Sequence, residues 1–214
     1  MSTTKLTIRV FTGVDTLLKN FLNQLFLKRD GFIEHLIKKE LPHLAEALGD
    51  RCNSPSARAF INQSMDKERL AKKITIVIDK SIAEKLRKIS MNHNLSRDAF
   101  VNRLLIIALL NQQQLKVLGV QQEASEIESV IGYSERTPSG PMSALSYWMD
   151  DPFFLIRESL KLAGENMYLV DLDCLKSGLN TKTACYLPDE QLPDPKFEEL
   201  AKSITKDDFL PEDL

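Results

Sequence analysis

The sequence predicts a mainly α-helical fold with a short antiparallel β-ribbon, followed by a small α/β or partly disordered acidic C-terminal region. Two observations predict the helical part and its ribbon: the stretch 73–110 combines an alternating segment with two helical patterns, and a weaker copy of it begins at residue 5. A third, an uneven division of charge, sets the C-terminal region apart. Because one strand and two helices are too few to bury their apolar faces alone, we expect the two copies to pack together.

The second copy opens with a strict alternation of apolar and other residues, which predicts a strand. Its two faces are Ile74, Ile76 and Ile78 on one side and Lys73, Thr75 and Val77 on the other. The apolar spacing then changes to the helical period, first over 82–89 and again over 100–108. The polar turn 92–95 separates the two predicted helices, and Ser96 is a suitable N-cap for the second one.

The first copy appears when Lys5 is aligned with Lys73 and the alignment is continued without a gap. Nine of 33 aligned pairs between 5–37 and 73–105 are identical, and most remaining core positions exchange like for like. The identical residues of the first copy are Lys5, Thr7, Ile8, Leu18, Leu27, Arg29, Asp30, Phe32 and Leu36. Such a match indicates an internal repeat. It predicts that the two copies pair within one chain; the alternative is that each pairs with its equivalent in a second chain.

The predicted organisation has five parts. They are copy one over 1–48, a linker over 49–72, copy two over 73–112, a polar connector over 113–141, and an acidic C-terminal interaction domain or tail over 142–214. Two prolines, a glycine and two serines in 134–142 predict the last boundary. Pro42 is expected to kink or restart the second helix of copy one. In the C-terminal part, we expect a helix capped by Asp151 and a short strand over 167–172.

The charge of the chain is strongly divided. Residues 1–110 carry 19 lysines and arginines against 11 acidic residues, a net charge of +8, whereas residues 111–214 carry a net charge of −10. A basic half joined to an acidic half predicts contact with a polyanion through the first half only. The longest apolar run, 104–110, is too short to span a bilayer, so no membrane partner is expected.

The order of strand, helix, polar turn and a helix that starts with Ser96-Arg97-Asp98 resembles the ribbon-helix-helix family of the methionine and Arc repressors. The run Lys72-Lys73-Ile74-Thr75-Ile76 is particularly similar to the ribbon of the methionine repressor. The resemblance covers residues 5–48 and 72–110, about 40% of the chain. In that family two strands form an antiparallel ribbon that enters the DNA major groove. Two copies in one chain therefore imply an intramolecular pseudo-dimer.

The resemblance also implies which residues would contact DNA. The outer ribbon face would contact bases through Lys5, Thr7, Arg9, Lys73, Thr75 and Val77. The start of each second helix would contact phosphates through Lys28, Arg29, Ser96 and Arg97. The alternatives are that the polar strand face is only solvated, and that Arg29 and Arg97 each pair with a nearby carboxylate. Because the copies differ at Arg9 and Val77 and at Lys28 and Ser96, we expect a DNA target with imperfect two-fold symmetry.

These features predict sequence-specific binding of double-stranded DNA, with a transcriptional repressor as the leading role. One alternative is an antitoxin-type autorepressor whose region 142–214 binds a toxin or other protein effector. Another is a DNA-bending accessory protein of a plasmid or phage nucleoprotein complex. An assembly protein whose ribbon contacts no DNA is a further alternative. Assembly of several copies on DNA is compatible with each DNA-binding role.

We expect no enzymatic activity, cofactor or metal. The chain has no GxxxxGK[ST], GxGxxG, GxSxG or HExxH motif. Its three histidines are scattered, and the pair Asp171 and Asp173 is too common a pattern to predict a metal site. Three cysteines without a CxxC pair fit a reducing compartment. The predicted location is therefore the cytoplasm, in association with the nucleoid.

Overall fold

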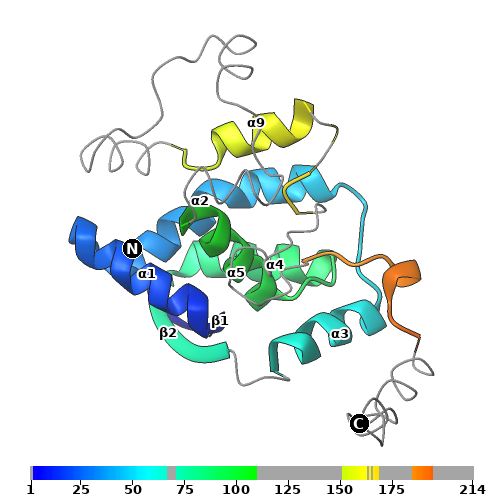
Figure 1. The fold of residues 1–214 in the computed structure, drawn as a ribbon, viewed down its shortest axis with the longest axis horizontal. Helices are drawn as coiled ribbons and strands as arrows, with labels where there is room; N and C mark the ends of the chain where they lie inside the picture. Colours follow the sequence, from blue (N-terminus) through cyan, green and yellow to red (C-terminus); the bar gives the residue numbers. More distant parts are fainter. Residues whose placement is uncertain are drawn as a thin grey trace, which may run out of the picture.

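The computed structural model describes residues 2–66, 71–109, 151–162, 164, 166–168 and 185–194. Its elements, in chain order, are β1 (Thr3–Phe11), α1 (Thr12–Leu25), α2 (Arg29–Leu48), α3 (Pro55–Asp66), β2 (Ala71–Asp79), α4 (Lys80–Asn92), α5 (Arg97–Leu109), α9 (Phe154–Leu162) and the short 3-10 helix η1 (Asp189–Gln191) (Figure 1). The described part is mainly helical and carries one two-stranded antiparallel sheet. This confirms the predicted class of a mainly α fold with a β-ribbon.

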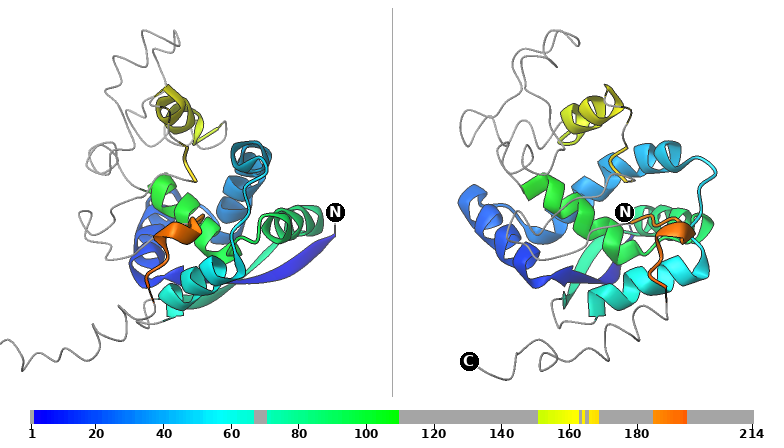
Figure 2. Two further views of the ribbon diagram at one scale, coloured as in Figure 1. Left: turned by 90° about the vertical axis from the view of Figure 1, so that its right-hand side faces the viewer. Right: turned by 45° about the vertical axis from the view of Figure 1, so that its right-hand side comes forward.

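The two strands pair along their whole length. Thr3 lies opposite Asp79, Thr7 opposite Thr75, and Phe11 opposite Ala71. One face of this ribbon is buried on the helices through Ile8, Val10, Ile74, Ile76 and Ile78, each at most 6% exposed. The alternation read from the sequence therefore places the isoleucines of β2 on the core face. Both views of Figure 2 show the strands on one side of the molecule, with helices covering them.

The turn between the two helices has the same backbone form in each copy. Phe26 and Asn94, which occupy equivalent positions in the two copies, both have positive φ angles, of 54° and 48°. Asparagine tolerates this left-handed conformation better than most residues, whereas phenylalanine does not. Phe26 is also 95% exposed. The turn of copy one is therefore strained at a residue that gains nothing from burial, and we expect it to be the less stable of the two.

The helix α2 continues through Pro42, although a kink or restart was expected there. Proline removes one backbone donor and crowds the preceding turn. Here Pro42 is exposed on the solvent side of α2, while Leu41 and Leu44 beside it are buried in the core. Burial along the length of α2 offsets the missing hydrogen bond, so tertiary packing outweighs the local preference.

The segment 49–72, expected to be a linker, contains the helix α3. The side chain of Ser54 accepts a hydrogen bond from the backbone N–H of Ala57 at 3.0 Å and so caps the start of this helix. Ala57, Ile61 and Met65 are spaced four apart and are all buried, at most 5% exposed. This stripe packs α3 onto the body of the protein, next to α5.

The described part of the region 142–214 packs on the core. The helix α9 lies against α2 on the side of the molecule away from the strands (Figures 1 and 2). Side chains from this region belong to the same hydrophobic cluster as the ribbon isoleucines: Phe153, Ile156, Leu160, Met167, Tyr168 and Cys185. The connector 113–141, most of the strand expected over 167–172 and the acidic tail beyond residue 194 lie outside the described residues.

A buried polar cluster joins α2 to the C-terminal segment. Glu40 is 0% exposed, and its Oε2 lies 2.6 Å from Nη1 of Arg157. The hydroxyl of Tyr168 donates a short hydrogen bond to the other oxygen of Glu40. Burial raises the pKa of Glu40 to about 7, against the opposing effects of the Arg157 charge and the Tyr168 hydrogen bond.

This pKa predicts a pH-dependent stability. In the folded protein Glu40 loses its proton near pH 7, whereas in the unfolded chain it does so near its ordinary pKa of 4.5. Between these values the folded state binds more protons, so the free energy of unfolding falls as pH rises, by about 3 kcal/mol from this group. We expect Glu40→Gln to remove this contribution to the decrease of the free energy of unfolding with rising pH. Urea unfolding at pH 5 and pH 7.5 measures it, and an equal pH dependence in both proteins would contradict the assignment.

Candidate nucleic-acid interface

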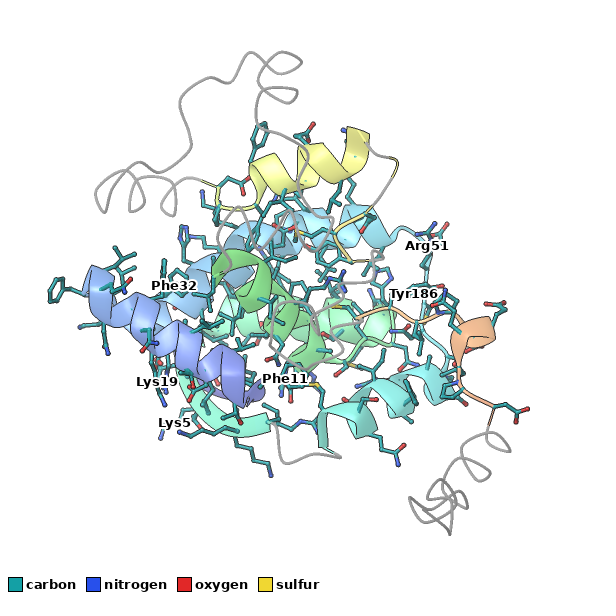
Figure 3. All side chains as sticks on the ribbon, viewed as in Figure 1. Lys5, Phe11, Lys19, Phe32, Arg51 and Tyr186 are labelled. Atoms are coloured by element: carbon teal, nitrogen blue, oxygen red, sulfur yellow. The ribbon has the colours of Figure 1, made fainter. Side chains whose placement is uncertain are left out.

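The outer face of the ribbon carries polar and cationic side chains. Lys5, Thr7, Lys73 and Thr75 are exposed, and Val77 is 43% exposed. The hydroxyls of Thr7 and Thr75 lie 3.1 Å apart at the centre of the ribbon, so the two strands contact each other on this face. Figure 3 shows Lys5 at the lower edge of the molecule, on the side opposite α9. Five of the six residues predicted to contact bases therefore share one accessible surface.

Arg9 is the sixth, and its side chain is held elsewhere. Its Nε lies 3.0 Å from Oδ2 of Asp98, and its Nη2 donates to Oδ1 of Asn62 at 3.1 Å. The Arg9 side chain is only 21% exposed. The guanidinium is thus drawn towards the start of α5 and towards α3, and in this conformation it does not project from the ribbon face.

The free edge of β1 is bonded by side chains from α5. The three contacts are Arg97 Nη2 donating to the carbonyl of Thr7 at 2.7 Å, the N–H of Arg9 donating to Asp98 at 3.2 Å, and the N–H of Phe11 donating to Asn102 at 2.9 Å. Because strand residues two apart present their backbone groups to the same edge, these contacts cover that edge from Thr7 to the end of the strand.

The free edge of β2 is bonded in the same way by α2. The contacts are Arg29 Nη2 to the carbonyl of Thr75 at 2.8 Å, the N–H of Val77 to Asp30 at 3.0 Å, and the N–H of Asp79 to Glu34 at 3.3 Å. Each contact on one edge has its counterpart at the equivalent positions of the other copy. We call the two sets the edge clamps. In both, the second helix of one copy binds the strand of the other.

The two arginines that were predicted to bind phosphate are both part of the edge clamps. Arg29 lies 3.0 Å from Asp30, and Arg97 lies 2.7 Å from Asp98, so each does pair with a neighbouring carboxylate. Their side chains remain 38% and 36% exposed. The primary contacts of both arginines are therefore within the protein, and a phosphate would have to approach their solvent-facing sides.

The other two predicted phosphate contacts differ from each other. Lys28, at the N-cap of α2, is exposed and makes no capping bond through its side chain. Ser96 is only 2% exposed, and its hydroxyl donates to Oδ1 of Asn62 at 2.8 Å. The helix α3 therefore covers the Ser96 hydroxyl, whereas the Lys28 side chain faces solvent.

Some residues that hold the ribbon and its neighbouring side chains were not predicted. Asp30 and Asp98 could have been found, because they are identical in both copies and stand beside the arginine that the copies share. Glu34 and Asn102 differ in type, which hid their common role as acceptors. Asn62 lies outside both copies. The sequence signal for its helix was the four-residue spacing of the apolar residues Ala57, Ile61 and Met65.

Comparisons with protein-family models, with curated proteins and with solved structures find no match to this chain. Within the described residues, no group of three or more His, Cys, Asp or Glu side chains is placed to hold a metal ion. Nor does that part of the chain contain a helix long and apolar enough to cross a membrane. The pair Asp171 and Asp173 lies outside the described residues.

The edge clamps predict unequal costs for two equivalent substitutions. Asp98 is 9% exposed and holds both Arg9 and Arg97, whereas Asp30 is 33% exposed and holds Arg29. We expect Asp98→Ala to lower the free energy of unfolding by about 3 kcal/mol, because it removes a nearly buried acceptor that serves two arginines and the backbone N–H of Arg9. Asp30→Ala should cost about 1 kcal/mol. Urea unfolding measures both, and equal costs would show that the Arg9 ion pair adds nothing to the clamp on β1.

Proposed function

We propose that this chain is a tandem ribbon-helix-helix pseudo-dimer that binds double-stranded DNA sequence-specifically through the outer face of its ribbon, and that it acts as a transcriptional repressor. The observation that carries the proposal is the pair of edge clamps. They hold two strands of one chain in a two-stranded ribbon, and a ribbon of this width fits the major groove. The side chains that remain exposed on it suit base edges.

The exposed side chains have complementary tasks on DNA. Lysine donates to the acceptors of guanine, threonine bonds several bases, and an apolar side chain contacts the methyl group of thymine. Thr7 and Thr75 occupy the centre, with Lys5 and Val77 paired on one side of it and Arg9 and Lys73 on the other. Because Arg9 is held by Asp98, we assign base contacts to the other five residues. The Val77 side should favour thymine, which makes the two half-sites unequal.

The distribution of charge supports the same orientation. The basic half of the chain contains the ribbon, and α9 of the acidic half lies on the opposite side of the molecule (Figure 2). Such an arrangement presents the cationic surface to DNA and keeps α9 away from the phosphates. The antitoxin-type and DNA-bending roles remain predictions; a reporter gene repressed from a selected site would favour the repressor.

The test begins with selection of bound duplexes from a random pool, followed by affinity measurements over a range of salt concentrations. Lys73→Ala should cost about 1–3 kcal/mol on the selected site and relax the preference for one base. Lys28→Ala should weaken all sequences about equally and reduce the slope of log K against log salt by about 1.

Lys38→Ala is the matched control, because Lys38 is an exposed lysine in the groove between α2 and α4 rather than on the ribbon. It should bind as the unaltered protein does. If Lys73→Ala retains both affinity and base preference, the ribbon does not read the bases and the proposal is wrong.

A further inference from the structure

A groove of about 700 Å³ runs beside β1 and is walled by α3, α4 and α5. Its lining combines cations from four elements: Lys5, Arg9, Arg58, Lys80, Arg87 and Arg97. Two acidic residues, Glu84 and Asp98, also line it. The formal charge of the lining is therefore +4, and its cations come from separate parts of the chain.

The two acidic residues do not neutralise the groove. Asp98 is already bonded by Arg9 and Arg97 within the clamp on β1. Glu84 lies 3.8 Å from Lys80, and both side chains are more than 60% exposed, so this ion pair is weak. Arg87 is exposed on α4, and Arg58 is anchored by an Nη1 hydrogen bond of 2.9 Å to Asn94. The anchored and the exposed arginine thus face the same space.

Guanidinium groups in this arrangement suit phosphate. Arginine binds phosphate oxygens through two parallel N–H donors, with a geometry that carboxylates and phosphates share. The groove is open to solvent and is continuous with the ribbon face, because Lys5 belongs to both. If the ribbon lies in the major groove, the sugar-phosphate backbone that borders that groove runs along the edges of the ribbon. One of these edges is the groove beside β1.

The cationic groove is not repeated on the other edge of the ribbon. The equivalent positions of copy one and copy two replace Arg9 by Val77 and Lys80 by Thr12, and Arg58 lies outside both copies. The counterpart of Arg87 is Lys19, which is paired with Asp15 at 2.7 Å. Lys28 and Lys72 stand in place of Ser96 and Thr4, so the other flank is also cationic but has no counterpart of the guanidinium groups of Arg58 and Arg87.

We propose that this groove binds the backbone phosphates of DNA beside the ribbon, and does so on the flank formed by α3, α4 and α5. The proposal rests on the DNA binding proposed above and adds a second, sequence-independent contact to it. Arg58 and Arg87 are the guanidinium groups that distinguish this flank from the other. Their phosphate contacts set the position of the protein on the duplex without reading its sequence.

The test compares Arg87→Ala, Arg58→Ala/Arg87→Ala and the control Lys88→Ala on a selected duplex. Lys88 is exposed on α4 but lines the separate groove between α2 and α4. Each lost phosphate contact should reduce the slope of log K against log salt by about 0.9, so the single and double variants should lose about 1 and about 2. Base preference should be unchanged, and Lys88→Ala should match the unaltered protein.

Ethylation interference locates the contacts directly. In the unaltered protein, ethylated phosphates should block binding more strongly on one flank of the site, and Arg87→Ala should lose that difference. Because Arg58 also bonds Asn94, the double variant is checked by thermal unfolding, and Arg87→Glu provides a second variant at an exposed position.

The outcomes separate this inference from the proposed function. If the unaltered protein shows no salt-dependent binding to duplex DNA, the proposed function fails. If it binds, but the Arg87 and Arg58 variants keep the full salt slope, the groove inference alone fails. Titration with inorganic pyrophosphate in the absence of DNA forms the last arm. Micromolar binding that Arg87→Ala abolishes, together with an unchanged DNA slope, would assign the groove to a free phosphorylated ligand and overturn the DNA assignment.

Discussion

The structure depends on the reciprocal bonding of two strand edges. A two-stranded ribbon has no third strand to cover either side, and its outward N–H and C=O groups would otherwise be left to water or to another chain. Here Arg97, Asp98 and Asn102 bond the edge of β1, and Arg29, Asp30 and Glu34 bond the edge of β2. The same contacts fix the register. A slip of one residue would turn the buried isoleucines outwards and the exposed lysines inwards.

The two copies differ on the ribbon, where Arg9 corresponds to Val77, and α3 adds a second difference between them. Asn62 on this helix bonds both Arg9 and Ser96, and Arg58 bonds the turn residue Asn94. The helix α3 thereby covers the turn of copy two at Asn94 and Ser96, whereas the equivalent residues of copy one, Phe26 and Lys28, are exposed to solvent. Two copies with matching edge contacts can in this way present a surface whose two sides carry different residues.

The parts of the fold that follow from local pattern could be predicted from the sequence. Alternation in 73–78 was sufficient to predict that the isoleucines of β2 lie in the core, and the ungapped alignment was sufficient to predict that the two copies pair. The direction of the Arg9 side chain could not be predicted, because Asp98 lies 89 residues away and its position depends on packing. The burial of Ser96 depends in turn on α3. The apolar stripe of this helix is short, and its segment was therefore predicted to be a linker.

Local rules also failed where packing was stronger. Proline usually ends a helix, yet α2 continues through Pro42 because Leu41 and Leu44 on its other side remain in the core. The acidic C-terminal region as a whole suggested a separate domain or tail from its composition. Its described segments nevertheless add Phe153, Ile156 and Tyr168 to the hydrophobic cluster beneath the ribbon. Composition could not predict this, because it carries no information about which residues are in contact.

The central claim is that the outer face of the ribbon enters the major groove of DNA. Methylation interference on a selected duplex tests it most directly, because dimethyl sulfate modifies guanine N7 in the major groove and adenine N3 in the minor groove. The account predicts that methyl groups on guanine N7 within the site block binding and that those on adenine N3 do not. Interference from adenine N3 alone would place the protein in the minor groove and contradict the account.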